Sequence, residues 1–358
     1  MHRESELAAA LGPLPCLVSL DAFGGPGDAA PLRNMARAFA AEAQTATTRA
    51  HGTLRRFRWL AAITGCDVVV GKLFEPHLDA LSILEELCGA ACDIVDRLAL
   101  PAEPLWAVWA AEGPGRLDAA QAADGAWRLQ GCKSWCSGAA RVDAALVGAR
   151  DAGGELRLFA VSLESTGIEM TREGWSAVGM AQTDSVDVLF HDVPAESVGG
   201  VGSYVDRIGF WHGAAGIAAC WHGAAVAIAQ PLRERAARGR AQGDPFVLAA
   251  LGAVDASLAS SALALREAAD AIDLHRGGGG PAFGQREALR LRAVVETAAQ
   301  GVIDHTGRAL GAGPLCRDAA HARRVADLTV FLRQSHAERD LAALGARVAH
   351  EGDTPWML

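Results

Sequence analysis

The hydrophobic pattern of this chain changes its period twice, which restricts the possible folds more than any other feature of the sequence. Apolar residues recur at helical spacing up to about residue 100, alternate in short runs to residue 204, and then return to helical spacing. This order predicts an N-terminal helical domain over 1–100, a β-domain over 101–204 and a C-terminal four-helix bundle over 205–358. The expected fold class is therefore mostly α with a central β-domain.

Segments rich in Gly, Pro and Asp separate the expected elements. We expect helices over residues 32–50, 54–63 and 71–98, and strands over residues 105–109, 126–130, 144–148, 155–161 and 186–191. Short strands joined by such turns predict a small antiparallel barrel or sandwich. Four long alanine-rich stretches follow, over residues 208–240, 247–275, 283–310 and 319–349. Their short connections predict an up-and-down bundle.

Composition excludes several classes of function. The net charge of −9 argues against a nucleic-acid groove, which needs surplus Lys and Arg. We find no apolar run of about eighteen residues and no signal for secretion, so we expect neither a membrane span nor export. The eight cysteines include no Cys-x-x-Cys pair, and spacings such as Cys132 to Cys136 favour buried small residues over zinc ligands. We expect a cytoplasmic protein without a metal.

Residues 131–139, Gly-Cys-Lys-Ser-Trp-Cys-Ser-Gly-Ala, place a tryptophan and a small hydroxyl residue two positions apart, just before a turn. Packing alone explains a tryptophan in a half-buried strand. The stretch nevertheless resembles the flavin-contacting strand of the acyl-CoA dehydrogenase family. That resemblance implies that Trp135 lies beside the isoalloxazine of FAD and that the Ser137 hydroxyl bonds the reactive edge of the ring.

The order of the three blocks is also the domain order of that family, and further stretches resemble it in sequence. Glu112, Pro114 and Gly115 occupy the place of its Thr-Glu-Pro-x-x-Gly-Ser-Asp segment, which lines flavin and substrate. Residues 174–194 resemble the end of its β-domain, with Gly179-Met180, Ser185, Phe190, Asp192-Val193 and Pro194 at matching positions. The resemblance thus extends over most of the chain from about Gly71 onward.

Two connections in the bundle resemble the family's binding segments for the rest of FAD. In residues 238–246, Arg238 and Arg240 compete for the position of an arginine that meets the pyrophosphate, and a plain surface arginine is the alternative. In residues 308–318, Gly311 and Gly313 match a glycine-rich turn whose backbone approaches the adenine-side phosphates. Any connection between two helices can also carry such glycines.

The chemistry of the family is desaturation of an acyl thioester: a carboxylate removes the α-proton while the β-hydrogen leaves as hydride to flavin N5. The base needs a raised pKa in a dry pocket, and it is usually the glutamate of a Tyr-Glu-Gly-Thr sequence. Counting from Gly311, Arg323 and Asp327 fall on the family's Arg and Asp. Ser335 then falls on the glutamate and His336 on the following glycine. The usual base is absent.

Three interpretations remain open, of which desaturation of an acyl thioester is our first expectation and the other two are its alternatives. Asp206 lies close to the position where one branch of the family carries its base, although an acidic residue opening a helix also stabilises the helix dipole. In a monooxygenase or oxidase branch, which lacks the glutamate, His336 or His212 could lie near the reaction, against the alternative of a satisfied structural histidine. A non-catalytic acyl- or flavin-binding module is the third. Glu351 lies too far beyond the helix register to be the base.

The expected partners follow from these interpretations. The dehydrogenase would use acyl-CoA or another acyl thioester and pass electrons to an electron-accepting flavoprotein, whereas the monooxygenase would need a reductase and O2. The resemblance also implies a homodimer or homotetramer. We expect neither nucleic acid nor a membrane as a partner.

Overall fold

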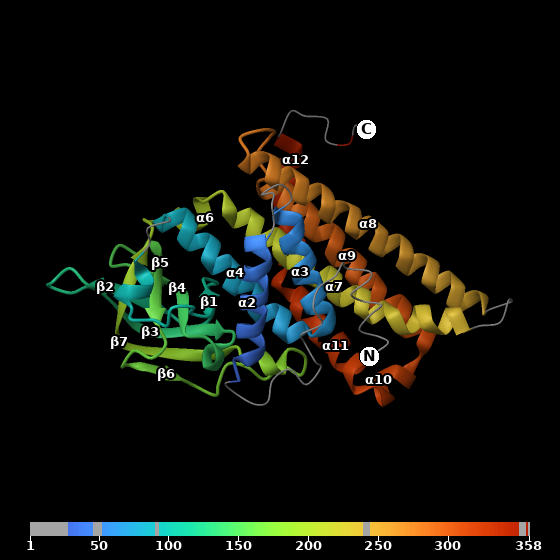
Figure 1. Cartoon of the computed structure of the whole chain (residues 1–358), viewed down its shortest axis with the longest axis horizontal. Coiled ribbons are helices and arrows are strands. Elements are labelled where there is room, and N and C mark those ends of the chain that lie inside the picture. The colour runs from blue at the N-terminus through green and yellow to red at the C-terminus, as the bar shows by residue number, and fades with distance from the viewer. Residues whose placement is uncertain (1–27, 46–51, 90–92, 239–243, 351–355, 357–358) are drawn as a thin grey trace. The chain divides into compact units, whose positions relative to one another are not determined.

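The central block of the chain forms a seven-stranded sheet that closes on itself in the computed structural model (Figure 1). The strands are β1 (Trp106–Trp109), β2 (Leu117–Gln121), β3 (Trp127–Cys136), β4 (Ala144–Arg150), β5 (Leu156–Ser162), β6 (Ile168–Met170) and β7 (Val186–Val198). Their order is β1-β4-β2-β3-β7-β5, with β6 beside β7, and an additional pairing of β5 with β4 closes a barrel. Most pairs are antiparallel, whereas β4 runs parallel to β1 and β2. The predicted small barrel is confirmed.

The structure describes residues 28–45, 52–89, 93–238, 244–350 and 356. Their contacts group into two compact units. The β unit lies within Asp21–Ala40 and Lys72–Phe210, and the helical unit within Ala41–Gly71 and Trp211–Leu358. The order of helices, strands and helices confirms the predicted fold class.

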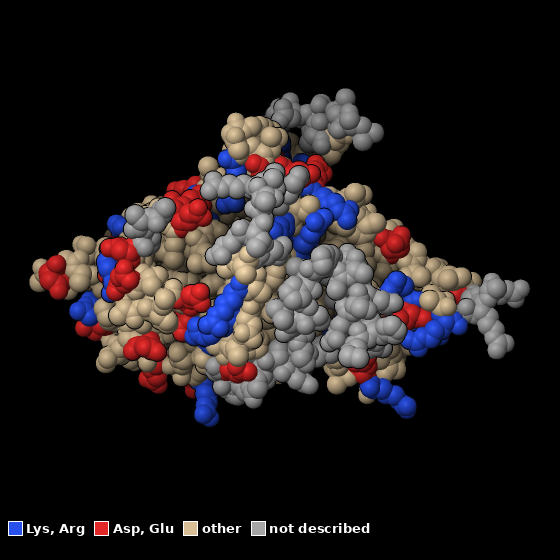
Figure 2. Space-filling model, in the orientation of Figure 1, with Lys and Arg blue, Asp and Glu red and all other residues tan. Residues whose placement is uncertain are grey.

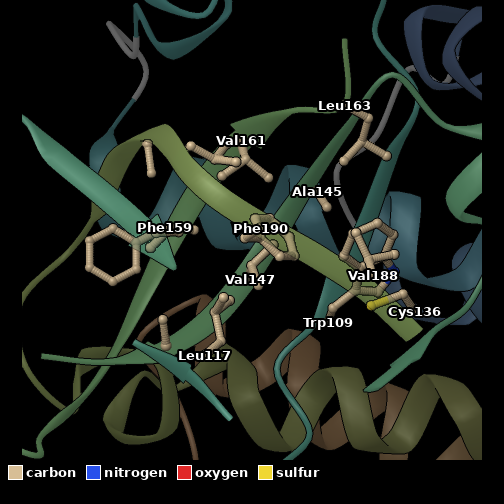
Figure 3. Close-up of a cluster of buried hydrophobic side chains, with 14 of the residues drawn as sticks. Trp109, Leu117, Cys136, Ala145, Val147, Phe159, Val161, Leu163, Val188 and Phe190 are labelled. Carbon is tan, nitrogen blue, oxygen red and sulfur yellow. The ribbon is translucent and has the colours of Figure 1, made fainter. Parts of the chain in front are cut away.

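Apolar side chains from all sides of the barrel fill its interior. Because successive strand residues point to opposite faces, β4, β5 and β7 each send every second side chain inward. Figure 3 shows Val147, Phe159 and Phe190 meeting in this cluster, and all three are fully buried. A second apolar layer lies where helix α4 (Val68–Cys88) packs Ala80 and Ile83 among residues of β1, β4 and β5.

Two strands and two helix breaks were not predicted. Strands β2 and β6 lack the runs of β-branched residues that predict a strand. Strand β2 reads Leu-Asp-Ala-Ala-Gln, and β6 has only three residues. The single helix expected over 71–98 is wrong: α4 ends at Cys88, Gly89 takes a left-handed φ of +79°, and the short α5 (Ile94–Arg97) follows.

The helical unit is built mainly from long helices. They are α3 (Gly52–Cys66), α7 (Gly209–Arg238), α8 (Pro245–Arg276), α9 (Gln285–Leu310), α10 (Ala312–Arg317), α11 (Ala319–Phe331) and α12 (Glu338–His350), and α2 (Ala30–Thr45) comes earlier in the chain. Gly223 allows α7 to lie directly on α3, since a Cβ at this position would overlap the backbone of Ala61. Asp244 begins α8 by accepting a hydrogen bond from the Phe246 amide at 2.9 Å.

The last helix expected, 319–349, is not continuous. Helix α11 ends in a 3-10 turn over Leu332–Gln334, Ser335 is extended, and Ala337 has a φ of +47°. The Ser335 hydroxyl accepts a hydrogen bond from the Ala337 amide at 3.1 Å, and Asp340 accepts one from the His336 amide at 3.1 Å. These local side-chain bonds stabilise the start of a new helix, α12, after the break. The hydrophobic pattern of the sequence does not reveal such bonds.

Helices α7 and α8 are long and apolar enough to cross a membrane by length and composition alone. The most apolar stretch of α7 is 72% buried within the protein, whereas that of α8 is only 17% buried. A core helix of a soluble protein passes the same test, so the finding is weak evidence of a span. Figure 2 shows acidic and basic side chains interspersed over the described part of one face.

Candidate functional site

Strand β3 contains a β-bulge at the motif that the sequence singles out. Between Lys133 and Cys136 the register against β7 shifts, so β3 carries one residue more than its partner strand. The extra residue breaks the alternation of inward and outward side chains: Lys133 and Ser134 are both buried, and Trp135 is exposed. Bulges of this kind redirect a side chain and are frequent beside active sites.

Trp135 is both exposed and strained. Its side chain is 47% exposed, and its φ of +62° lies in the left-handed region. For a bulky residue without local compensation, that conformation costs on the order of 1–3 kcal/mol. A tryptophan that served only to pack a strand would be extended and buried, so packing does not account for this one.

The turn after the bulge is held from three sides. The indole of Trp109, buried in β1, donates through Nε1 to the Ser137 carbonyl oxygen at 3.1 Å. The Gly138 amide donates to the Thr183 carbonyl oxygen at 2.8 Å. Gly138 has a φ of +73°, and a Cβ there would come within 2.9 Å of the Leu73 side chain, so glycine is required. These contacts fix the position of the Ser137 side chain.

The loop between β1 and β2 runs directly beside the bulge. The Gly115 amide donates to the Ser134 hydroxyl at 3.1 Å. A Cβ at Gly113 would lie 2.9 Å from Ser134 Cβ and 3.4 Å from the Trp135 ring. The two glycines therefore let the loop backbone pass the indole with no side chain between them. We call the backbone of residues 113–115 the glycine shelf.

Three hydroxyl groups form a chain beneath the turn. Ser137 Oγ lies 2.7 Å from Ser185 Oγ, which lies 2.9 Å from Thr183 Oγ1. Thr183 Oγ1 donates to the Met180 carbonyl oxygen at 2.8 Å. Ser185 and Thr183 are buried, whereas Ser137 is half-buried. Ser137 is therefore the end of the chain that a ligand can reach.

An ion pair holds the segment that carries these hydroxyls. The buried Arg141 donates to the Asp184 carboxylate at 2.8 Å and to the Gln182 carbonyl oxygen at 3.0 Å. Met180 and Asp184, on either side of the 3-10 turn over Ala181–Thr183, have φ values of +59° and +44°. The ion pair thus stabilises a tight, strained segment whose hydroxyls meet Ser137.

Lys133 lies two residues before Trp135 and is also buried. Its Nζ donates to the Gly148 carbonyl oxygen of β4 at 3.0 Å, which ties β3 to a strand that is not its neighbour. Burial lowers the pKa of the Lys133 ammonium group. On the loop that carries the glycine shelf, Glu112 forms an ion pair with Arg150.

The arrangement fits a flat heteroaromatic cofactor such as a flavin. The exposed indole offers a face to a ring and Ser137 offers a hydrogen bond beside it, while the glycine shelf packs closely on β3, where a Cβ would meet Ser134 or Cys132. Sequence reasoning identified Trp135 and Ser137 but missed Thr183, Ser134 and the anchoring indole. The only signal for Thr183 is its alternation with Ser185 just before β7, which is common at strand ends.

The three predicted catalytic residues lie in different places. Asp206 is an exposed residue at the end of the short α6 (Ser203–Asp206) in the β unit, next to Arg207, which is buried between Asp79 and Glu86. Ser335 is buried in the helical unit at the break before α12. His336 is exposed, and its Nδ1 lies 3.3 Å from the Asp340 carboxylate. The catalytic roles stay predictions.

The Arg and Asp counted along the last helices do contact each other. Arg323 donates to the buried Asp67 at 2.6 Å and lies 3.9 Å from Asp327. Asp67 also accepts from the Val69 amide at 2.9 Å and so caps the start of α4. Within the helical unit, these residues therefore serve to connect α11 to the start of α4.

Three of the residues expected near the phosphates, Arg238, Gly311 and Gly313, are exposed. Arg238 donates to Glu234, one helical turn earlier, at 2.7 Å, and Arg240 lies outside the described residues. Gly311 ends α9 with a φ of +66°, and a Cβ at Gly311 or Gly313 would meet no atom within 4 Å. Phosphate binding by these residues stays a prediction.

No protein-family model matches the sequence, and no curated protein sequence matches it. Several solved structures, in contrast, match the fold of this chain. Butyryl-CoA dehydrogenase from Megasphaera elsdenii is 15% identical, with a TM-score of 0.78 and 97% of each chain covered. Indole-bound TdsC from Paenibacillus sp. A11-2 is 19% identical, with a TM-score of 0.75 and 99% of each chain covered. Methanesulfinate monooxygenase MsuC from Pseudomonas fluorescens is 18% identical, with a TM-score of 0.70 and 97% and 96% covered. The chain has the acyl-CoA dehydrogenase fold over nearly its whole length.

Proposed function

We propose that this protein is a flavin-dependent oxidoreductase whose ring site lies at the β3 bulge. The strained, exposed Trp135 carries the proposal, because packing leaves it unexplained and a stacked ring explains it. When bound, the flavin would supply two-electron redox chemistry and, in monooxygenation, the activation of O2. The protein would hold the ring between Trp135, Ser137 and the glycine shelf.

Of the two reactions of this fold, we propose monooxygenation, with a reductase as the electron source. Ser335 stands where the desaturating carboxylate is expected, and its hydroxyl is engaged by the Ala337 amide. Two carboxylates that contact residues on either side of Ser335 are themselves bonded: Glu296 pairs with Arg333 at 2.7 Å, and Asp340 accepts from the His336 amide. A neutral serine cannot remove an α-proton from a thioester. Dibenzothiophene monooxygenase (TdsC) and MsuC share the fold.

Desaturation of an acyl thioester is the second candidate, since butyryl-CoA dehydrogenase has a TM-score of 0.78 to this chain. Asp206 would be its base. The two reactions separate in one experiment on the flavin-loaded protein without O2. Bleaching of the flavin by any member of a panel of acyl-CoA thioesters would refute monooxygenation, and loss of bleaching in Asp206→Asn would assign the base.

If the acyl-CoA panel has no effect, the monooxygenase should form an oxygenated product from an aromatic probe such as indole when given a flavin reductase, NADH and O2. Failure of the purified protein to bind FAD or FMN would refute both reactions and favour the non-catalytic module. We keep FAD as the proposed form, although TdsC has been solved with FMN. Arg238→Ala should then weaken FAD more than FMN, because only FAD has a pyrophosphate.

We also propose a soluble homo-oligomer formed through α8. The outward face of this helix is lined by small and apolar residues, namely Leu248, Ala249, Gly252, Ala256, Ala259 and Leu263. Asp255 is the one charged residue on α8 between Pro245 and Leu265. Small residues allow a second copy of the helix to approach closely, and burial of this face would remove apolar surface from water. Leu263→Glu should convert the oligomer to a monomer in light scattering.

A further inference from the structure

The direction of the hydroxyl chain beneath Ser137 follows from counting protons. Each hydroxyl carries one proton to donate and can accept in return, whereas a carbonyl oxygen can only accept. The chain ends at the Met180 carbonyl, to which Thr183 Oγ1 donates at 2.8 Å. The polarity of the whole chain is therefore set at its buried end.

The remaining donors follow one by one. Because Thr183 has given its proton to the carbonyl, Ser185 must donate to Thr183 across their 2.9 Å contact. Because Ser185 has then given its proton, Ser137 must donate to Ser185 across their 2.7 Å contact. Ser137 Oγ is left with lone pairs alone on its open side.

We propose that Ser137 acts as a hydrogen-bond acceptor toward the flavin, with Ser185 and Thr183 as the positioning residues that fix its direction. The inference rests on the proposed flavin site. N5 of an oxidised flavin has no proton and needs a donor, whereas N5 of a reduced flavin bears a proton and needs an acceptor. Two-electron reduction with one proton delivered to N5 thus creates the partner that Ser137 requires. The site favours the reduced form.

Burial makes this direction hard to reverse. Thr183 is 1% exposed and Ser185 is 4% exposed, so water does not supply alternative partners for them. Reversal would turn the Thr183 proton away from Met180, whose carbonyl oxygen also accepts from the Trp175 indole at 3.0 Å. The reversed chain would make Ser137 a donor toward the flavin. It predicts that Ser137→Ala changes the midpoint potential of the bound flavin in the opposite direction.

The test measures the affinity of the protein for oxidised and for reduced flavin, together with the midpoint potential of the bound flavin titrated with dithionite. Ser137→Ala should weaken binding of the reduced form about tenfold and leave the oxidised form unchanged. For a two-electron couple, a tenfold change lowers the midpoint potential by about 30 mV. Ser137→Thr, which keeps a hydroxyl, should retain the wild-type ratio of affinities.

The positioning role has its own signature. In Ser185→Ala, the Ser137 proton has lost its acceptor and can turn toward N5, so the oxidised form should bind more tightly while the reduced form keeps its affinity. Both variants should lower the midpoint potential. Ser137→Ala does so by weakening binding of the reduced flavin, and Ser185→Ala does so by strengthening binding of the oxidised flavin. Ser197→Ala is the matched control, because this hydroxyl on β7 donates to the Gly199 carbonyl oxygen at 3.1 Å and lies outside the chain of three hydroxyls.

A rise in the midpoint potential of Ser137→Ala, or unchanged affinities in Ser185→Ala, would overturn the proposed direction while leaving the flavin site intact. A wild-type protein that binds neither form of flavin would overturn both the direction and the proposed function. Near-ultraviolet circular dichroism of each variant shows whether the fold is retained, and Thr183→Val repeats the Ser185 test at the next hydroxyl.

Discussion

Substitution of one glycine in the shelf should uncouple flavin binding from folding. In Gly115→Ala, the new Cβ would lie 2.8 Å from the Cys132 carbonyl oxygen and 2.9 Å from Ser134 Oγ. The carbonyl is backbone and cannot rotate away, so the loop must move by several tenths of an ångström. The 3.1 Å hydrogen bond from the Gly115 amide to Ser134 is lost in that movement.

The size of the effect follows from these two contributions. Loss of the hydrogen bond to the buried Ser134 costs about 1 kcal/mol, and relief of the overlap costs about 1–3 kcal/mol. If the loop must return to its wild-type position when the ring binds, then roughly 2 kcal/mol opposes binding, which is about a 30-fold increase in Kd. The thermal midpoint should fall by only a few degrees, since the barrel core is untouched.

Titration of flavin fluorescence gives the Kd, and a thermal melt gives the stability. Gly200→Ala is the matched control: this glycine lies in the same unit, is not at positive φ, and a Cβ there meets no atom within 4 Å. It should bind flavin as the wild type does. A Gly115→Ala protein with a Kd within twofold of wild type would refute the role assigned to the glycine shelf.

Four further outcomes concern stability. Gly223→Ala should destabilise the protein by about 1–3 kcal/mol through overlap with α3, whereas Gly345→Ala, at an open site on α12, should stabilise it by about 0.5–1 kcal/mol in urea denaturation. Burial and the nearby Arg266 charge lower the pKa of His222 to about 4. The unfolded chain therefore binds more protons between pH 6.5 and 4, so stability should fall by about 3 kcal/mol on acidification through this window, and less in His222→Gln. Arg207→Ala, which leaves two carboxylates without their buried cation, should lose about 3–5 kcal/mol in the same assay.

The sequence allows the order of elements to be predicted because periodicity is a local property. The long helices α7, α8 and α9 start and end within a few residues of their expected bounds, since Gly and Pro mark their ends. The helix expected over 319–349 fails because two side chains, Ser335 and Asp340, cap a new helix in mid-stretch. Such bonds depend on geometry that a hydrophobic pattern does not carry.

The candidate site divides in the same way. Trp135 and Ser137 lie in one nonamer and can be recognised as a linear motif. The partner of Ser137 lies 48 residues further along the chain, and the bulge that exposes Trp135 arises from the pairing of β3 with β7. Pairing register is a long-range property, so neither feature could be read from the nonamer alone.

The strain at Trp135 decides between packing and ligand binding for this motif. A left-handed tryptophan persists only if its surroundings hold it, and here they do: Trp109 and Thr183 fix the following turn, and Ser134 is bonded to the loop beside it. A barrel of this size could pack without an outward indole, because its interior is already filled by other side chains. Several hydrogen bonds that converge to hold one exposed, strained ring next to a one-directional hydroxyl chain therefore indicate a partner ring outside the fold. The sign of the Ser137→Ala potential shift tests which form of that ring the protein prefers.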